Sequence, residues 1–412
     1  MLLVVGSGAV ARGSLHPTPL VHTIAVGRMP SALAVDTRRG RVFVANEGAN
    51  SVSVLDVRTG AVLATTGVGL APTALAVDET AGRVFVLTAG AALTSHDRVS
   101  VLDARTGRLL RDVDVGVGAG VAAVADGRGQ IFVTDEADNT VSMLDAQQGR
   151  LLRTVPVGPA PAGIAVDVQA GHVLIVNQGT FQPALAVYPH EHGTVSVLDT
   201  RTGTVLRTVP VGSEPRAIAV DIRRGHAFVT NHYGDTVSVL DVATGAVLRT
   251  VPVAPQPGAV AVNARMGRVF IASDNGGMGL VSVLDAAEGR VLHRVPVGER
   301  VVALAAEERH GQVLVVTKPD IVPPTEPGHL HVLDGRTGQL RRTVTVGLQP
   351  RALAVDAVAS RAFVLNGGGA VHEAWVERGA AWLRRWAPWL PPQSAATRTL
   401  SATVSVLDTA CL

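Results

Sequence analysis

The chain has 412 residues, and its 36 basic and 34 acidic side chains leave a formal net charge of +2. This near balance argues against a general attraction to nucleic acid. The single cysteine, Cys411, excludes an internal disulfide framework. No apolar run reaches the roughly 18 residues that a membrane-spanning helix needs.

Residues 1–21 precede the first predicted strand. They open with MLLVVGSGAVARG, in which a short apolar run is followed by Ala9-x-Ala11, a pattern that resembles a signal-peptidase site. A basic segment is missing in front of that run, and Gly6 and Gly8 interrupt it. A remnant signal segment and a plain N-terminal extension therefore both stay open.

From residue 22 onward, the chain repeats with a period of about forty residues, which is typical of a repeat architecture. We name the predicted strands by their first examples. They are D (HTIAVG, 22–27), A (ALAVD, 32–36), B (RVFVAN, 41–46) and C (SVSVLD, 51–56). Each strand type occurs eight times, and the C strands end at Asp56, Asp103, Asp145, Asp199, Asp241, Asp285, Asp334 and Asp408.

The D strands are displaced by one unit relative to the other three types. Seven follow a C strand, while the remaining one, 22–27, precedes the first A strand. Pairing of 22–27 with 403–408 would close a ring and remove the exposed sheet edges. The sequence thus predicts an all-β, eight-bladed propeller of four-stranded antiparallel blades. We expect residues 22–412 to form this single domain, with an insertion at 367–402 in blade 8.

Two recurrent features are interpreted as structural. The Asp that ends each C strand begins a four-residue C–D connection, as in Asp56-x-x-Thr59-Gly60, where it can cap a turn. Calcium binding by these Asp residues is the alternative, which we do not favour. Six of the seven Phe residues share one B-strand position, which we expect to pack between neighbouring blades: Phe43, Phe85, Phe132, Phe228, Phe270 and Phe363.

The connections differ between the two ends of the blades. A–B and C–D connections are nearly all four residues long, whereas B–C connections range from EGAN in blade 1 to the insertion in blade 8. In a meander, the B–C and D–A connections share one face, which we call the variable face; the A–B and C–D turns form the turn face. Variable loops on a rigid scaffold predict that binding occurs on the variable face.

Histidines and one acidic residue concentrate in the predicted B–C loops: His96, His190, Glu191, His192, His232, His329 and His372. Imidazole is a ligand for Zn, Cu or Fe, so His190 and His192 are weak candidates for a metal site. Solvated loop histidines are the alternative, which we favour. The residues identify no cofactor.

All four tryptophans lie in the blade 8 insertion: Trp375, Trp382, Trp386 and Trp389. If the insertion is helical, Trp375, Trp382 and Trp386 fall on one stripe. Three interpretations stay open, namely a lid over the propeller, an arm that docks a partner protein, and a peripheral membrane contact through 371–390.

The B and C strands together carry a family signature. VFVANEGANSVSVLD (42–56) and AFVTNHYGDTVSVLD (227–241) resemble the YVTN-repeat, or YncE-like, β-propellers. The resemblance covers residues 22–366 and 403–408. It implies a secreted, periplasmic or cell-surface protein with a binding or structural role.

We therefore expect a monomeric, extracytoplasmic propeller that binds a small molecule or a protein partner on its variable face, without catalytic residues. The first alternative is a metal-dependent enzyme, either a lactonase-like hydrolase or a redox enzyme, that uses the histidines and acids of this face. The second is a structural protein of a cell-surface layer.

Overall fold

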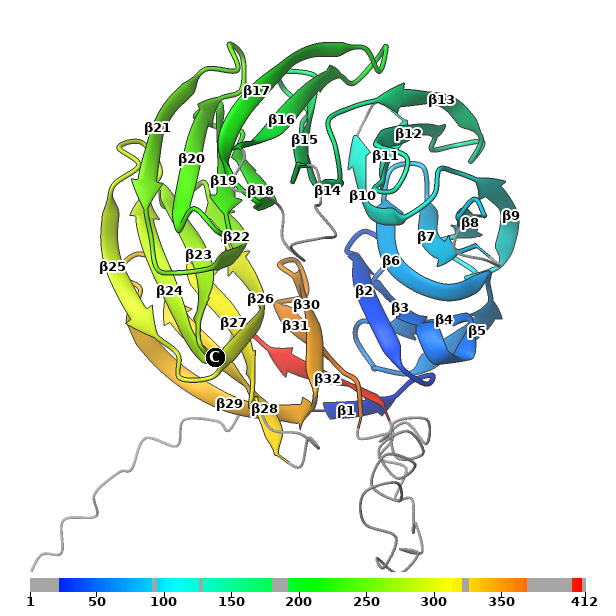
Figure 1. The fold of residues 1–412 in the computed structure, drawn as a ribbon. Helices are drawn as coiled ribbons and strands as arrows, with labels where there is room; N and C mark the ends of the chain where they lie inside the picture. Colours follow the sequence, from blue (N-terminus) through cyan, green and yellow to red (C-terminus); the bar gives the residue numbers. More distant parts are fainter. Residues whose placement is uncertain are drawn as a thin grey trace, which may run out of the picture.

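The computed structural model describes residues 22–90, 95–125, 129–179, 192–320, 326–368 and 402–409. Its strands form eight four-stranded antiparallel sheets, arranged as the blades of a ring (Figure 1). The predicted eight-bladed propeller is confirmed. No helix among the described residues has the length and apolar character that crossing a membrane requires.

The A strands are innermost, and each contacts the A strands of both neighbouring blades. They are β2 (Pro30–Asp36), β6 (Leu70–Asp78), β10 (Ala119–Ala125), β14 (Pro161–Asp167), β18 (Pro215–Asp221), β22 (Pro257–Asn263), β26 (Arg300–Glu307) and β30 (Pro350–Asp356). The B strands are β3 (Arg41–Asn46), β7 (Arg83–Ala89), β11 (Gln130–Asp135), β15 (His172–Asn177), β19 (His226–Asn231), β23 (Arg268–Asn275), β27 (Gln312–Lys318) and β31 (Arg361–Asn366).

The C strands follow, and the D strands lie at the rim. The C strands are β4 (Ser51–Asp56), β8 (Arg98–Asp103), β12 (Thr140–Asp145), β16 (His192–Asp199), β20 (Thr236–Asp241), β24 (Met278–Asp285), β28 (Pro327–Asp334) and β32 (Thr403–Asp408). The D strands are β5 (Val62–Gly67), β9 (Leu109–Asp114), β13 (Leu151–Pro156), β17 (Val205–Ser213), β21 (Val247–Pro252), β25 (Val291–Pro296), β29 (Leu340–Leu348) and β1 (His22–Ala25). A 3₁₀ turn, η1 (Glu47–Ala49), follows β3.

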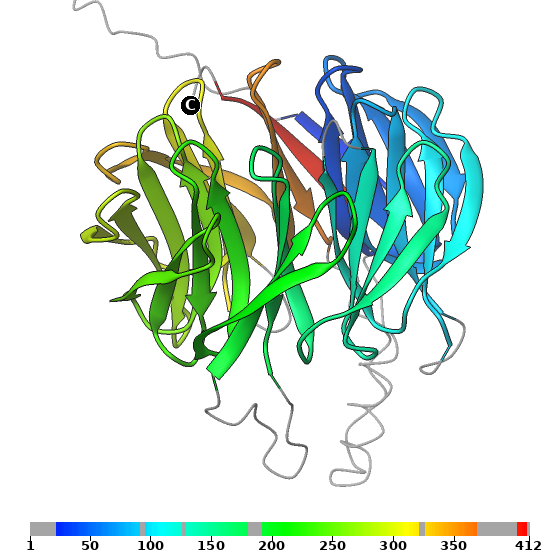
Figure 2. The same cartoon turned by 90° about the horizontal axis from the view of Figure 1, so that it is seen from above.

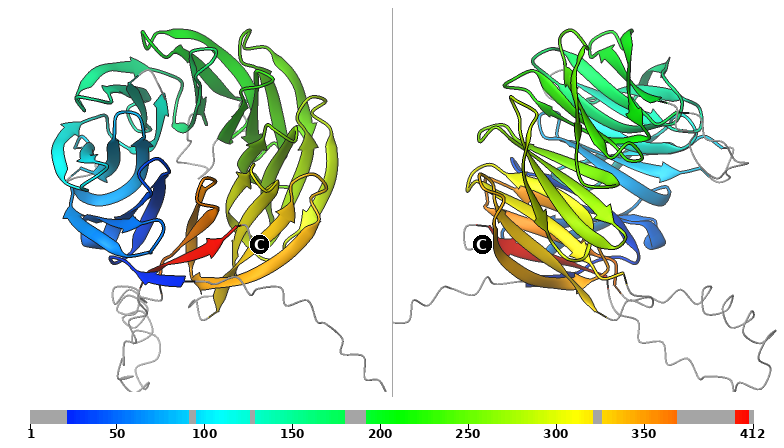
Figure 3. Two further views of the ribbon diagram at one scale, coloured as in Figure 1. Left: turned by 180° about the vertical axis from the view of Figure 1, so that it is seen from behind. Right: turned by 60° about the vertical axis from the view of Figure 1, so that its left-hand side comes forward.

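Ring closure occurs in blade 8, where β1 completes the sheet in the order β1-β32-β31-β30. His22 pairs with Val406 and Ile24 with Val404, and Figure 3 shows β1 in blue beside β32 in red. The Val26 N–H also donates to the carbonyl of Ala402, at 3.1 Å. The predicted closure is therefore confirmed.

The core consists of the apolar layers between adjacent blades. Phe43 of blade 1 is fully buried against Val84 and Val86 of blade 2, and Phe363 of blade 8 packs on Val42 of blade 1. A phenyl ring thus fills the space that twisted sheets leave between them. The predicted inter-blade role of the Phe position is confirmed.

The C–D turns are capped as predicted. The Asp56 carboxylate accepts hydrogen bonds from the backbone N–H of Arg58 and Thr59 and from the Thr59 hydroxyl, at 2.9–3.0 Å. These bonds, led by the one from the Thr59 N–H, lower the pKa of Asp56. Figure 2 shows the ring edge-on, with the turn between β30 and β31 projecting from one side.

Candidate functional site

The variable face is built on D–A turns that hold one residue in the left-handed backbone region. In six blades a residue other than glycine takes this conformation immediately before a proline at or near the start of the A strand: Met29, Ala71, Ala160, Glu214, Gln256 and Gln349. Such residues are uncommon and need surrounding contacts to hold them. The contact here comes from the B–C connection, whose first N–H donates to the carbonyl of that residue, as His232 does to Glu214 at 2.9 Å.

Beneath these turns lies a repeated polar contact. The amide nitrogen of Asn231 donates to the hydroxyls of Thr236 and Ser238, at 3.0 Å each, and Asn46, Asn177 and Asn366 make equivalent contacts. Gly212 packs on this amide so closely that an added Cβ would lie 2.5 Å from the Asn231 side chain. The Gly of strand D and the Asn of strand B are therefore a structural pair.

Blade 3 carries Asp135 at the Asn position. Its carboxyl accepts from the Gly116 N–H at 3.1 Å, the Thr140 hydroxyl at 3.0 Å and the Ser142 hydroxyl at 2.8 Å. Burial is the dominant cause that raises the pKa of Asp135 to about 6, and the neighbouring Asp138 acts in the same direction. A carboxyl here is less suited to the fold than the amide of the other blades.

Blade 7 replaces the same contact by a chain of side chains. Glu299 Oε2 accepts from the Thr317 hydroxyl at 2.9 Å and lies 3.1 Å from His329 Nδ1. Thr317 Oγ1 is 3.0 Å from His331 Nε2, and His331 Nδ1 is 3.0 Å from the Thr343 hydroxyl. The signal for this cluster, the pair His329-x-His331, was visible in the sequence, but only its first member was selected there.

The four described candidate histidines lie in different blades, so the structure does not bring them together. His96, His192 and His232 place Nδ1 at 3.0–3.3 Å from the carbonyls of Val115, Val211 and Pro257, respectively. The expected loop position is wrong for two of them, because β16 begins at His192 and His329 pairs with Thr317 within β28. Strand pairing extends two residues beyond the repeat boundary at His192, whereas His329 takes the first position of its C strand, equivalent to Ser51.

The other candidate residues lie outside the described residues: His190, Glu191, His372, Trp375, Trp382, Trp386 and Trp389. The interpretations of the tryptophan insertion and of the His190 metal site therefore stay predictions. Within the described part of the chain, no group of three or more His, Cys, Asp or Glu side chains is placed to hold a metal ion.

Acidic pH should weaken the fold through blade 7. Burial, reinforced by the neighbouring His329, lowers the pKa of His331, which is 7% exposed. Because the unfolded chain binds this proton more readily, the contribution of His331 to stability is lost as the pH falls below the ordinary value of 6.5. We expect His331→Ser, which restores the hydroxyl of the other blades, to lose less stability between pH 7.5 and pH 5 than the wild type. Urea unfolding of both proteins at the two pH values measures these losses of stability, and equal losses in the wild type and the variant would contradict the prediction.

Blades 5 and 6 expose large side chains on the variable face. Tyr233, 45% exposed, stands in the B–C connection of blade 5, and Met278, 61% exposed, begins β24 in blade 6. The Tyr233 ring lies 5.3 Å from that of His232. In blade 5, near His232, Arg216 donates through Nε and Nη2 to the buried Glu214, at 2.9 and 2.6 Å. Burial, with the charge of Arg216, lowers the pKa of His232, so the imidazole is neutral at pH 7.

Comparisons with known proteins bear on the fold. The profile of a family described as outer membrane protein assembly factor BamB matches residues 191–373, which include the Tyr233 and Met278 region. The YVTN-specific assignment is not tested by this match and stays a prediction. A search of curated proteins found no match.

Solved structures share the architecture at low identity. BamB from Moraxella catarrhalis has 14% identity and a TM-score of 0.60, covering 95% of this chain and 99% of its own. Dihydro-heme d1 dehydrogenase NirN has 15% identity and a TM-score of 0.63, covering 81% and 69%. Hydrazine synthase of Kuenenia stuttgartiensis has 14% identity and a TM-score of 0.55, covering 87% and 96%. The chain is therefore an eight-bladed β-propeller that is similar to the BamB family over residues 191–373.

Proposed function

We propose that the protein is a non-catalytic, extracytoplasmic binding scaffold that holds a partner protein on its variable face, over blades 5 and 6. The observation that carries this proposal is the exposure of Tyr233 and Met278 on adjacent blades of that face. Tyr, Met and Arg are enriched in protein interfaces, and exposed apolar side chains bind best when their backbone is rigid.

The surrounding contacts supply that rigidity. The His232 N–H is bound to the carbonyl of Glu214, and Glu214 is 3% exposed and paired with Arg216. Tyr233 is thus displayed from a fixed turn, so little conformational entropy is lost on binding. The BamB-family match spans this region, and its description names an assembly factor of the outer membrane, which supports a partner in the cell envelope.

Site-specific crosslinking tests the proposal. A photoreactive residue at position 233 or 278 should capture one and the same protein in intact cells, while the same residue at Arg105 or Arg201, in C–D turns of the turn face, should not. With that partner purified, we expect Tyr233→Ala combined with Met278→Ala to weaken binding by more than tenfold, since truncated interface anchors cost about 2 kcal/mol or more.

The paired variant Arg105→Ala with Arg201→Ala serves as the binding control and should leave the affinity unchanged. Cell fractionation should place the captured complex outside the cytoplasm. Equal capture from both faces would contradict the proposed binding surface, and a cytoplasmic complex would contradict the proposed location.

A further inference from the structure

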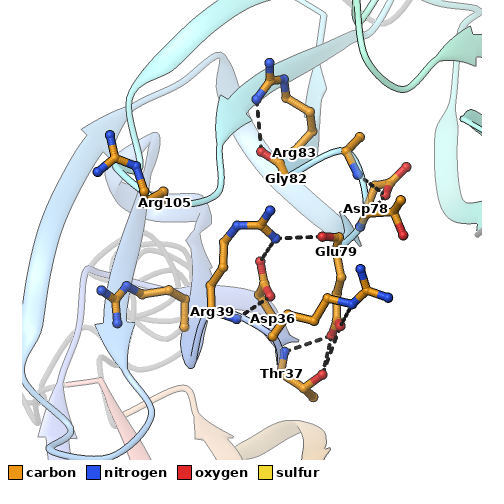
Figure 4. A network of polar contacts seen from close by, with 12 residues as sticks. Asp36, Thr37, Arg39, Asp78, Glu79, Gly82, Arg83 and Arg105 are labelled. Atoms are coloured by element: carbon orange, nitrogen blue, oxygen red, sulfur yellow. Dashed lines mark hydrogen bonds and ion pairs between the residues drawn. The ribbon is translucent and has the colours of Figure 1, made fainter.

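The opposite end of the ring, the turn face, has an inter-blade network of its own. The Asp36 carboxylate accepts from the Arg39 backbone and guanidinium, at 2.9 Å each, and the same guanidinium donates to the Glu79 carbonyl in blade 2 at 2.7 Å (Figure 4). In return, the Glu79 carboxylate accepts from the N–H and the hydroxyl of Thr37, at 2.7–2.9 Å. Arginines here therefore have a structural role in joining one A–B turn to the next.

The two halves of this network recur separately, one between blades 5 and 6 and the other between blades 6 and 7. Arg224 binds the Asp221 carboxylate at 2.7 Å and the Ala264 carbonyl at 3.1 Å. Glu308 accepts from the Ala264 N–H at 3.0 Å, as Glu79 does from Thr37. Arg224 thus joins blade 5 to blade 6, and Glu308 joins blade 7 to blade 6.

A second set of arginines lies in the A–B turns of blades 5, 6 and 7, one residue before the position that Arg39 and Arg224 occupy in their turns. Arg223 of blade 5 and Arg265 of blade 6 are exposed, and neither guanidinium has a hydrogen bond or ion pair with any described residue. Arg309 of blade 7 reaches the carbonyls of Ala357 and Val358 through Nη1, at 3.1 and 2.8 Å.

These three arginines line one open surface pocket of about 540 Å³, together with Glu308, Ala357 and Val358. The lining thus holds three guanidinium groups and one carboxylate, whose Oε1 accepts from the Ala264 N–H, so positive charge exceeds negative charge at this place. The feature is local, because the equivalent positions in blades 2 and 4 hold Thr80 and Gln169, and Arg38 in blade 1 lies 3.7 Å from Glu79.

We infer that this arginine cradle binds a small organic anion through carboxylate or phosphate groups. Planar guanidinium groups form paired hydrogen bonds with such oxyanions. The volume falls within the range of small-molecule sites. Val358, which is 71% exposed, offers an apolar surface beside the charges, so an anion with a carbon skeleton fits better than a bare inorganic ion.

Isothermal titration calorimetry of the full chain with citrate and with glycerol 3-phosphate tests the inference and distinguishes carboxylate from phosphate groups. We expect one or both to bind, and binding to weaken as salt is added. Arg223→Gln with Arg265→Gln should lower the affinity by about a hundredfold, or tenfold for each charged hydrogen-bond donor removed. This variant should melt as the wild type does, since neither side chain has an intramolecular partner among the described residues.

Arg105→Gln with Arg336→Gln removes the same charge from C–D turns of the turn face and should change the affinity less than twofold. The inference is overturned if neither anion binds, or if the two double variants lose affinity equally, because either result would leave only a diffuse surface charge.

Discussion

Deletion of residues 1–27 should lower the melting temperature of the protein markedly and cause it to aggregate. The deletion removes β1 and exposes the backbone edge of β32 between Thr403 and Val406. It also removes Ile24 and Val26, which pack on the apolar cluster between blades 8 and 1.

The expected loss is large on the scale of a folded protein. Burying an aliphatic side chain contributes about 1.5–3 kcal/mol, and each lost strand hydrogen bond about 1 kcal/mol. The sum is several kcal/mol, a large fraction of the roughly 5–15 kcal/mol that typically separates folded from unfolded states. An open strand edge then favours pairing between chains.

Two variants serve as controls. Deletion of residues 1–21 retains β1 and should keep the wild-type melting temperature. A permuted chain that starts at residue 28 and carries residues 22–27 after Thr409, through an Asp-x-x-Thr-Gly-type turn, should also recover it, because β1 then follows β32 as every other D strand follows its C strand. Melting curves with light scattering measure both properties. A monomeric deletion variant with unchanged melting would show that closure adds little.

Asp135→Asn should stabilise the protein at neutral and alkaline pH, but hardly at acidic pH. In blade 8, the Asn366 amide donates to the hydroxyls of Thr403 and Ser405, while its oxygen accepts from the Gly347 N–H at 3.1 Å. An Asn at position 135 would make the same three contacts with Thr140, Ser142 and Gly116, without a buried charge.

The direction of the pH dependence follows from the raised pKa of Asp135. With a pKa of about 6 in the fold and 3.8 as the ordinary value, the folded protein holds this proton more tightly than the unfolded chain. The contribution of protonated Asp135 is fully present below 3.8 and is lost as the pH rises through about 6. One pH unit corresponds to about 1.4 kcal/mol, so the variant gains up to roughly 3 kcal/mol at pH 8 and little at pH 4.

Asn231→Asp is the reciprocal variant and should lose stability at pH 8 while approaching the wild type at pH 4. Urea unfolding of all three proteins at both pH values makes the comparison. A gain from Asp135→Asn that does not change with pH would mean that the buried carboxyl does not titrate in this range.

Much of the fold was predictable from sequence because each blade repeats the same local rules. Alternating apolar residues define the strands, Asp and Gly define the C–D turns, and the displaced D strand at 22–27 defines the closure. The Phe position was predictable for the same reason, since a side chain with one place in every repeat meets the same neighbours.

The sites were less predictable, because they depend on departures from the repeat and on contacts between blades. We predicted His192 and His329 in loops, yet both lie in strands. Pairing of His192 with Ser213 continues beyond the repeat boundary, and His329 takes the first position of its C strand, where it pairs with Thr317. The A–B and C–D turns have nearly the same length in every blade, so turn length provided no signal for a site on the turn face.

What the sequence determined by itself is the strand order, the number of blades and the closed ring, since these follow from local pattern and count. Only the tertiary structure decided which arginine side chains form hydrogen bonds within the protein and which are available to bind an anion. Arg223 and Arg224 are adjacent in the chain, but Arg224 binds Asp221 and the next blade, while Arg223 lines the open pocket. That difference arises from the direction each side chain takes across the blade interface, which spacing along the sequence does not encode.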